Sequence, residues 1–206
     1  MPFLKLFFLL LIIQNVSLGQ KSNKFEGILT YTISEVKSKD SIEGKAVIFC
    51  KDSLIKVVNF ETNNRQELLK HLTYKKSYIL VEIDSHKYAI RTNEHLEKDT
   101  VTYSMKKKCS SKKIGGLKSK KIVVKYAENK LPLTCYYHKK ISSKYANAMR
   151  NFPGLPTLFY TFSDNGIFRH TLSGIENKEL PISLFSIPKE YQIVTWEDFL
   201  LMQGQE

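Results

Sequence analysis

The chain has 206 residues, of which 42% are hydrophobic and 25% are charged, and its formal net charge is +12 at pH 7. This length is typical of a single domain with one sizeable core. No stretch is long and apolar enough to cross a membrane as a helix, which needs roughly 20 apolar residues. We therefore expect one domain and no integral membrane protein.

The first nineteen residues, MPFLKLFFLLLIIQNVSLG, have the layout of a cleaved secretory signal. Lys5 provides the positive start, residues 6–13 are an unbroken apolar run, and Ser17 and Gly19 are small residues at the cleavage site. We expect residues 1–19 to be a signal peptide, residues 20–206 to be one β-rich domain, and the mature chain to be periplasmic or secreted. A buried N-terminal helix or an uncleaved anchor is the alternative.

Three cysteines follow this segment, an odd number, which allows one disulfide with one free thiol, or no disulfide. Cys50 lies in the apolar run AVIFC and is typical of a core residue. Cys109 lies among lysines, which would lower the pKa of an exposed thiol. An unreactive Cys109 is nevertheless favoured, because no His or acidic residue is close in sequence to activate it.

Alternation of apolar and polar residues dominates the rest of the chain and predicts strands. Short turns separate these strands, which indicates a mainly β fold with a curved or closed antiparallel sheet. The predicted strands are FEGILTYTISE, GKAVIFC, SLIKVVNF, YILVEID, HKYAIR, TVTYSMKK, KKIVVKY and LTCYYHKK. The second and third are apolar on both faces, so both faces need cover from another layer or from a ligand.

Few helices are expected, and each has its own signals. Ser142 or Ser143 is a suitable N-cap for a helix whose apolar face holds Tyr145, Ala148, Met149 and Phe152, and which Pro153 and Gly154 would end. Near the C-terminus, Thr195 and Asp198 resemble a capping box for a second helix. Its apolar stripe, expected to pack on the sheet, contains Trp196, Phe199 and Leu200, and Val194 precedes it as a hydrophobic staple.

A candidate apolar binding face comes from the strand after Pro156. A three-residue loop, Asp164 to Gly166, would place apolar side chains on one side of the hairpin and polar side chains on the other. The apolar set is Leu158, Tyr160, Phe162, Phe168 and Leu172, with His170 among them, and the polar set is Thr161, Ser163, Arg169 and Thr171. The apolar set predicts either ordinary core or the wall of a pocket for an apolar ligand. A histidine in such a place is more often a packing residue than a functional one.

The positive charge is concentrated in one stretch. Residues 101–163 hold thirteen Lys, one Arg and one acidic residue, and residues 106–121 alone hold eight Lys. Such a stretch binds anionic surfaces or polymers, or is simply a solvated face. Since export is expected, nucleic acid is not an expected partner. The candidate anion-binding residues are Lys112, Lys113, Lys120 and Lys121.

The residues of known catalytic and metal motifs are not found in this sequence. The five histidines form no metal-protease motif, and no cysteines have zinc-like spacing. No nucleophile elbow is present. IGGLKSKK lacks the spacing of a phosphate loop, and a predicted strand rather than a helix follows PGLP. We therefore expect no enzyme activity, no cofactor and no metal.

Four segments in the same order resemble a group of exported envelope proteins of diderm bacteria, the GLPGLI family, and a related family of unknown function. They are SKKIGGLKSKKIVVKY, CYYHKKI, PGLPTLFYTF and LFSIPKEYQ. Thr157 stands where the GLPGLI motif would repeat Gly, so the related family is the nearer match. The resemblance implies a half-barrel similar to the periplasmic lipoprotein carriers, a curved antiparallel sheet with a few short helices on its concave or open side.

Three functions remain open, of which an uncharacterised hydrolase is the least favoured because the sequence has no nucleophile motif. The resemblance and the aromatic face together favour an exported, non-enzymatic envelope protein that binds a lipid or an acylated protein in its half-barrel. The alternative is a structural or interaction protein that docks on anionic envelope material through its lysine-rich face.

Overall fold

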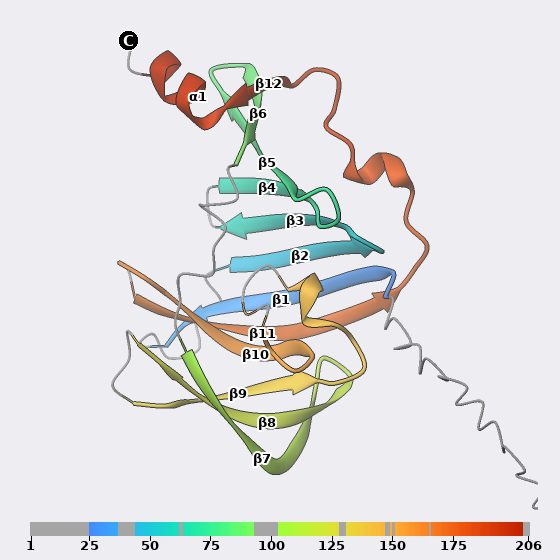
Figure 1. Cartoon of the computed structure of the whole chain (residues 1–206), viewed down its shortest axis with the longest axis vertical. Coiled ribbons are helices and arrows are strands. Elements are labelled where there is room, and N and C mark those ends of the chain that lie inside the picture. The colour runs from blue at the N-terminus through green and yellow to red at the C-terminus, as the bar shows by residue number, and fades with distance from the viewer. Residues whose placement is uncertain are drawn as a thin grey trace, which may run out of the picture.

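The computed structural model describes residues 25–36, 44–61, 64–92, 103–127, 131–146, 149, 151–164 and 166–203. The expected signal peptide, residues 1–19, lies outside these ranges. The described residues form a single sheet of twelve strands in the order β12-β6-β5-β4-β3-β2-β1-β11-β10-β9-β8-β7 (Figure 1).

The strands in chain order are β1 (Gly27–Glu35), β2 (Gly44–Lys51), β3 (Leu54–Glu61), β4 (Asn64–His71), β5 (Lys76–Ile83), β6 (His86–Arg91), β7 (Tyr103–Ile114), β8 (Leu117–Tyr126), β9 (Leu133–His138), β10 (Leu155–Ser163), β11 (Gly166–Asn177) and β12 (Gln192–Thr195). Two 3-10 helices, η1 (Ser143–Tyr145) and η2 (Ile182–Phe185), and one α-helix, α1 (Trp196–Gln203), complete the described elements.

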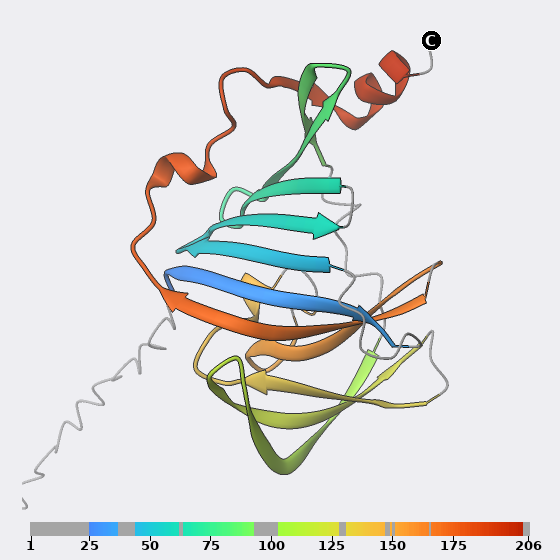
Figure 2. The same cartoon turned by 180° about the vertical axis from the view of Figure 1, so that it is seen from behind.

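The fold class expected from the sequence is confirmed: the protein is mainly β, with one curved and open sheet. Neighbouring strands are antiparallel except β12, which runs parallel to β6. β12 and β7 lie at opposite ends of the sheet (Figures 1 and 2). The sheet curves so far that the tip of the β7–β8 hairpin at Gly115 lies against Leu172 of β11, although two strands separate β8 from β11 in the sheet.

Two strands are not predicted by the alternation pattern. β4 has charged and polar residues on both faces, yet it pairs with β3 along its whole length. Part of the reason is an ion cluster between the strands, where Glu67 accepts from Lys56 at 2.7 Å and also contacts Arg65. Burial acts to raise the pKa of Glu67, but these two cations outweigh it and lower the pKa. The other missed strand, β12, is only four residues long and depends on β6 for its pairing.

The two-sided apolar character of β2 and β3 is explained by cover on both faces. On one face the principal core includes Ile48 and Val57, which are directly opposite each other. On the other face Val58 of β3 is buried, and beyond it, on β4, β5 and β6, a second, smaller core forms around Leu69, Leu80 and Ala89. Ile187 and Tyr191, from the segment between β11 and β12, pack against this second core. The chain's own C-terminal segment supplies cover on this side: η2 contacts β3, and the residues after it pack on the second core as the segment runs past β1–β6 (Figure 1).

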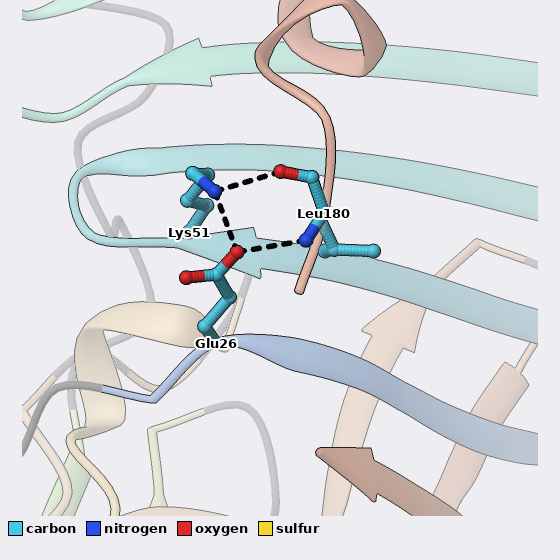
Figure 3. A network of polar contacts seen from close by, with 3 residues as sticks. All are labelled: Glu26, Lys51 and Leu180. Carbon is cyan, nitrogen blue, oxygen red and sulfur yellow. Dashed lines mark hydrogen bonds and ion pairs between the residues drawn. The ribbon is translucent and has the colours of Figure 1, made fainter. Parts of the chain in front are cut away.

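A polar cluster fixes the beginning of that crossing segment (Figure 3). Lys51 Nζ donates to Glu26 Oε1 at 2.6 Å and to the Leu180 carbonyl at 2.7 Å, and the Leu180 N–H donates to the same Glu26 oxygen at 2.7 Å. The hydrogen bonds from Lys51 and Leu180 lower the pKa of Glu26. Leu180 itself is buried, 4% exposed. The cluster thus ties β2 and the start of β1 to the chain where it leaves β11.

The helix predicted after Ser142 is wrong. Ser142 does act as a cap, accepting from the Lys144 N–H at 3.3 Å, but only the three-residue η1 follows. Ala146 is already extended, and Met149 has a left-handed φ of 64°. Tyr145, Met149 and Phe152 are all buried in the principal core, from 0% to 4% exposed. An irregular path lets each of them reach the core separately, and this outweighs the helical spacing. Ala148 lies outside the described residues.

The Pro-Gly-Leu-Pro segment, Pro153 to Pro156, has a different structural role from the one expected. Gly154 does not end a helix; it allows a close approach, because a Cβ there would lie 2.4 Å from the His138 carbonyl oxygen. Leu155 then donates to the Ile141 carbonyl at 2.8 Å, and Pro156 accepts from the Tyr31 hydroxyl at 2.7 Å. This segment therefore places the start of β10 in close contact with β9 and with a buried tyrosine of β1.

The C-terminal helix α1 is confirmed and Thr195 caps it, with Asp198 contacting the Thr195 hydroxyl, whereas in a capping box it would accept from the backbone N–H. The Asp198 N–H donates to Thr195 Oγ1 at 3.0 Å, and the Thr195 hydroxyl donates to Asp198 Oδ2 at 2.8 Å. Phe199 packs edge-on against Tyr88 of β6, with ring centroids 5.7 Å apart. Leu200, expected in the same packed stripe, is 53% exposed.

Candidate functional site

The β10–β11 hairpin does not have the register expected from the sequence. Ser163 pairs with Gly166 and Phe162 with Ile167, so the loop contains two residues rather than three. Of these two, Asn165 lies outside the described residues. The pairing is one residue away from the predicted one, and a shift of one residue exchanges the two faces of a strand.

The five residues of the predicted apolar face are therefore divided between the two sides of the hairpin. Leu158, Tyr160 and Phe162 lie on one side, while Phe168 and Leu172 lie on the other, because Thr161 pairs with Phe168 and Leu158 with Thr171. Leu158 and Leu172 are buried, 9% and 1% exposed, and the other three are half-buried. Of the expected polar set, only Ser163 is exposed.

The neighbouring strand explains this register. β11 is also paired with β1, where Tyr31 lies opposite Leu172 and Ile33 opposite His170. In the observed register, Phe159 lies opposite His170 and stacks on it, with ring centroids 4.6 Å apart and an angle of 8° between the planes. The sequence pattern of the hairpin alone contains no information about this third strand.

His170 is a packing residue held by two neighbours. A hydrogen bond of 2.8 Å joins its Nε2 to Thr161 Oγ1, and Phe159 covers one face of its ring. Burial lowers its pKa from the ordinary 6.5 to about 4, because the charged form loses hydration. His170 is therefore neutral at physiological pH.

The principal core includes Leu158 and Leu172 of the predicted binding face, and Tyr160 and Phe162 pack against it. Its centre is a set of fully buried tyrosines, of which Tyr31 contacts Phe159, Tyr126 contacts Phe162 at a centroid distance of 4.8 Å, and Tyr145 receives the Phe25 N–H at 3.1 Å. The segment around η1 contributes Tyr145, and Met149 and Phe152 follow it into the same core. The connection between β9 and β10 thus contributes three buried residues to the core around these tyrosines.

The three cysteines are not joined by disulfides. Cys50 and Cys135 are fully buried, and burial raises both pKa values, that of Cys135 to about 12. Cys135 Sγ lies 3.6 Å from the Tyr126 hydroxyl. Cys109 is exposed on β7, so it is the one cysteine of the three that solvent reaches.

The most distinctive surface is the β7–β8 hairpin, residues 103–126, called the lysine hairpin below. It contains nine Lys and no acidic residue. Residues 104–113 are exposed without interruption. The turn is formed by Gly115 and Gly116, with φ of 52° and 82°, the positive values that a tight hairpin turn requires. The sequence IGGL is therefore a hairpin turn.

The structure brings the four candidate lysines onto this one hairpin. Lys113 lies directly opposite Lys118, Lys120 opposite Ser111, and Lys121 opposite Tyr136 of β9. Lys112 places its Nζ 4.5 Å from the centre of the Tyr136 ring, a cation–π contact. Lys112, Lys113 and Lys120 are exposed, while Lys121 is half-buried.

The charge of the lysine hairpin is not neutralised within the described part of the chain. The ion pairs found there are Lys51–Glu26, Lys56–Glu67, Arg65–Glu67, Lys87–Glu82 and Lys178–Glu176. None of them includes a lysine of the hairpin. Lys113 and Lys118 are instead like charges in directly opposed positions, an arrangement that is unfavourable in a sheet unless an anion offsets it.

No three His, Cys, Asp or Glu side chains among the described residues gather to hold a metal ion. The described helices include none of the length and apolar character needed to span a membrane. No family model matches the chain, and none of the curated proteins does.

The free energy of unfolding should fall as the pH drops from about 6.5 to about 4, in part because of His170. The unfolded chain binds a proton on this imidazole near pH 6.5, whereas the folded chain resists it until about pH 4, so acid favours the unfolded state in that window. The contribution between pH 7 and pH 5 is about 2 kcal/mol. Urea unfolding of the wild type and of His170→Gln at both pH values measures it.

The difference in stability between pH 7 and pH 5 should be smaller in His170→Gln. Glu26 and Glu67 do not contribute to this comparison, because carboxyls of lowered pKa lose their stabilisation only below the ordinary value of 4.5. An equal loss of stability in the wild type and in the variant would contradict a neutral, buried His170.

Proposed function

We propose that this protein is an exported, non-enzymatic envelope protein that docks on an anionic partner through the lysine hairpin. One observation carries the proposal: nine lysines on two adjacent strands, with residues 104–113 exposed on both faces and no ion pair to the hairpin within the described ranges. Exposed charges of one sign attract an opposite surface over about 8 Å at physiological ionic strength.

The rigid sheet supports this role better than a mobile tail would. β8 pairs with both β7 and β9, so the lysines of β8 are held in fixed positions. Ile122 and Val124 of the same strand are fully buried, which anchors the hairpin in the principal core. The lysines therefore project from a surface that needs little ordering when it binds, which lowers the entropic cost of association.

Replacement of Lys112, Lys113, Lys120 and Lys121 by Gln should weaken binding to anionic phospholipid vesicles by about tenfold or more, since each lysine near such a surface contributes about 1 kcal/mol. Binding by the wild type should also fall steeply as salt rises. Vesicle co-sedimentation over a salt series measures both effects.

The matched control removes four exposed lysines outside the hairpin: Lys45, Lys75, Lys76 and Lys189. Both variants have the same net charge, so a purely global charge effect would weaken them equally. Equal loss in the two variants, or binding that salt does not change, would refute docking through the hairpin.

Export is part of the proposal and rests on the N-terminal sequence. Lys5, the apolar run of residues 6–13 and the pair Ser17 and Gly19 are the features of a cleaved signal. N-terminal sequencing of the protein from its native host should begin at Gln20, with or without cyclisation of that residue. Recovery of the uncleaved chain from the cytoplasm would refute export.

A second candidate function is binding of a lipid or an acylated protein. The observation in its favour is that an irregular segment covers part of the aromatic core. Among the described residues between β9 and β10, η1 is the only regular structure, yet this connection supplies Tyr145, Met149 and Phe152 to the core. An acyl chain that displaced this segment would gain a large apolar surface, worth roughly 25 cal/mol per Å² before the costs of binding.

Phe162→Ala tests this second function, because Phe162 is half-buried and contacts Tyr126. The variant should lose about 1–2 kcal/mol of stability, less than the 3–5 kcal/mol typical of a fully buried ring. If the region accepts an acyl chain, binding of a fluorescent fatty acid should fall as well. Ser163→Ala is the control, exposed and expected within about 0.5 kcal/mol of the wild type.

Thr161 does not serve as a control, because it is the hydrogen-bond partner of the buried His170. Failure of the wild-type protein to bind the fatty acid would exclude the second function and leave the lysine hairpin unaffected.

A further inference from the structure

β7 is the last strand at its end of the sheet, so no other strand of the described ranges lies along one of its edges. Among the described residues, its backbone forms strand pairing with β8 only, and no other backbone hydrogen bond reaches it. Such an edge presents N–H and C=O groups that a further strand can pair with. β7 is also twelve residues long, much longer than β12 at the opposite end of the sheet.

The edge of β7 is divided into two regular runs. Its pairing with β8 is interrupted between Lys107 and Ser111, which leaves the runs Tyr103–Lys107 and Ser111–Ile114 on either side. An interruption of this kind limits continuous pairing and protects an edge from uncontrolled aggregation. A short partner segment can still pair with one run, and the run that holds Lys106 and Lys107 is the candidate.

The charge of β7 determines which partner is suitable. A second copy of the same strand would bring lysines next to lysines, which is unfavourable across a strand pair. An anionic lipid surface or a polyphosphate would match the charge but would leave the backbone edge unpaired. A polypeptide with acidic side chains satisfies both the charge and the edge.

We propose that the partner of the lysine hairpin is an extended acidic polypeptide segment that adds to the sheet as a strand beside β7. This rests on the function proposed above and specifies its partner. Lys106 and Lys107 are neighbours in the strand and therefore point to opposite faces. The partner consequently carries acidic side chains at consecutive positions, one for each face. Strand addition of this kind obtains affinity from backbone hydrogen bonds and specificity from side chains.

The test uses a blocked, fluorescent peptide with four consecutive glutamates flanked by threonine and valine, and fluorescence anisotropy with the full mature chain. Two analogues carry N-methyl groups on alternate amides, one on the odd positions and one on the even positions. In an added strand only one of these two sets faces β7. One analogue should therefore bind about tenfold more weakly than the parent peptide and the other within about threefold, since two or three backbone hydrogen bonds are lost in one case only.

A third analogue, with glutamine in place of glutamate, should bind more weakly and with little dependence on salt. The location is tested with Lys106→Gln together with Lys107→Gln, which should weaken binding of the parent peptide more than Lys75→Gln together with Lys76→Gln. Both lysines of this control pair are exposed and lie next to each other in sequence, away from the hairpin.

The outcomes separate this inference from the function on which it rests. If both N-methylated analogues bind as well as the parent, or if the parent fails to bind while anionic vesicles bind in a salt-dependent manner, strand addition is refuted and docking through charge stands. If neither the parent peptide nor the vesicles bind, both proposals are refuted.

Discussion

The Glu26 carboxylate is the contact on which the two-layered part of the structure depends. It receives Lys51 and the Leu180 N–H together, and so holds the chain at the point where it leaves β11. From there the chain continues through η2 to β12 and α1, and Ile187 and Tyr191 cover the second core on the way. A sheet that is apolar on both faces needs such a layer, since exposed apolar strands invite pairing with other chains. The protein thus completes its own fold with a segment that contains little regular structure.

The opposite half of the sheet is organised around buried tyrosines. Tyr31 of β1 donates to the Pro156 carbonyl of β10, and burial raises its pKa, so the hydroxyl remains a donor at any physiological pH. Gly154 permits the close approach to β9 that this arrangement requires. The curvature that results brings the tip of the lysine hairpin back to Leu172. The same packing that makes the core therefore also sets the position of the charged edge, and this connects the stability of the fold to the proposed binding surface.

The lysine hairpin combines two properties that are usually separate. Lysines on an edge strand protect a sheet from aggregation, because they repel another copy of the same edge. The same lysines attract an acidic segment, so the protection is selective rather than complete. The directly opposed pair Lys113 and Lys118 indicates that charge is tolerated here at a cost to local stability. The other strands are well paired, so this local repulsion is an exception within the sheet. Such exceptions are common at binding sites.

The sequence alone determined the class of the fold, most of the strands, the capped C-terminal helix and the clustering of lysines, because each depends on the pattern of nearby residues. Tertiary contacts decided the rest. β4 lacks the alternation of apolar and polar residues that predicts a strand, and it is stabilised instead by the ion pair between its Glu67 and Lys56 of β3. The helix predicted after Ser142 does not form, because Tyr145, Met149 and Phe152 are each buried in the core from an irregular segment. In the observed β10–β11 register, Phe159 of β10 contacts both His170 of β11 and Tyr31 of β1, a strand that the pattern of the hairpin does not include. Alternation within a hairpin shows which residues are apolar, but only the strand beside it decides which of them face the same side.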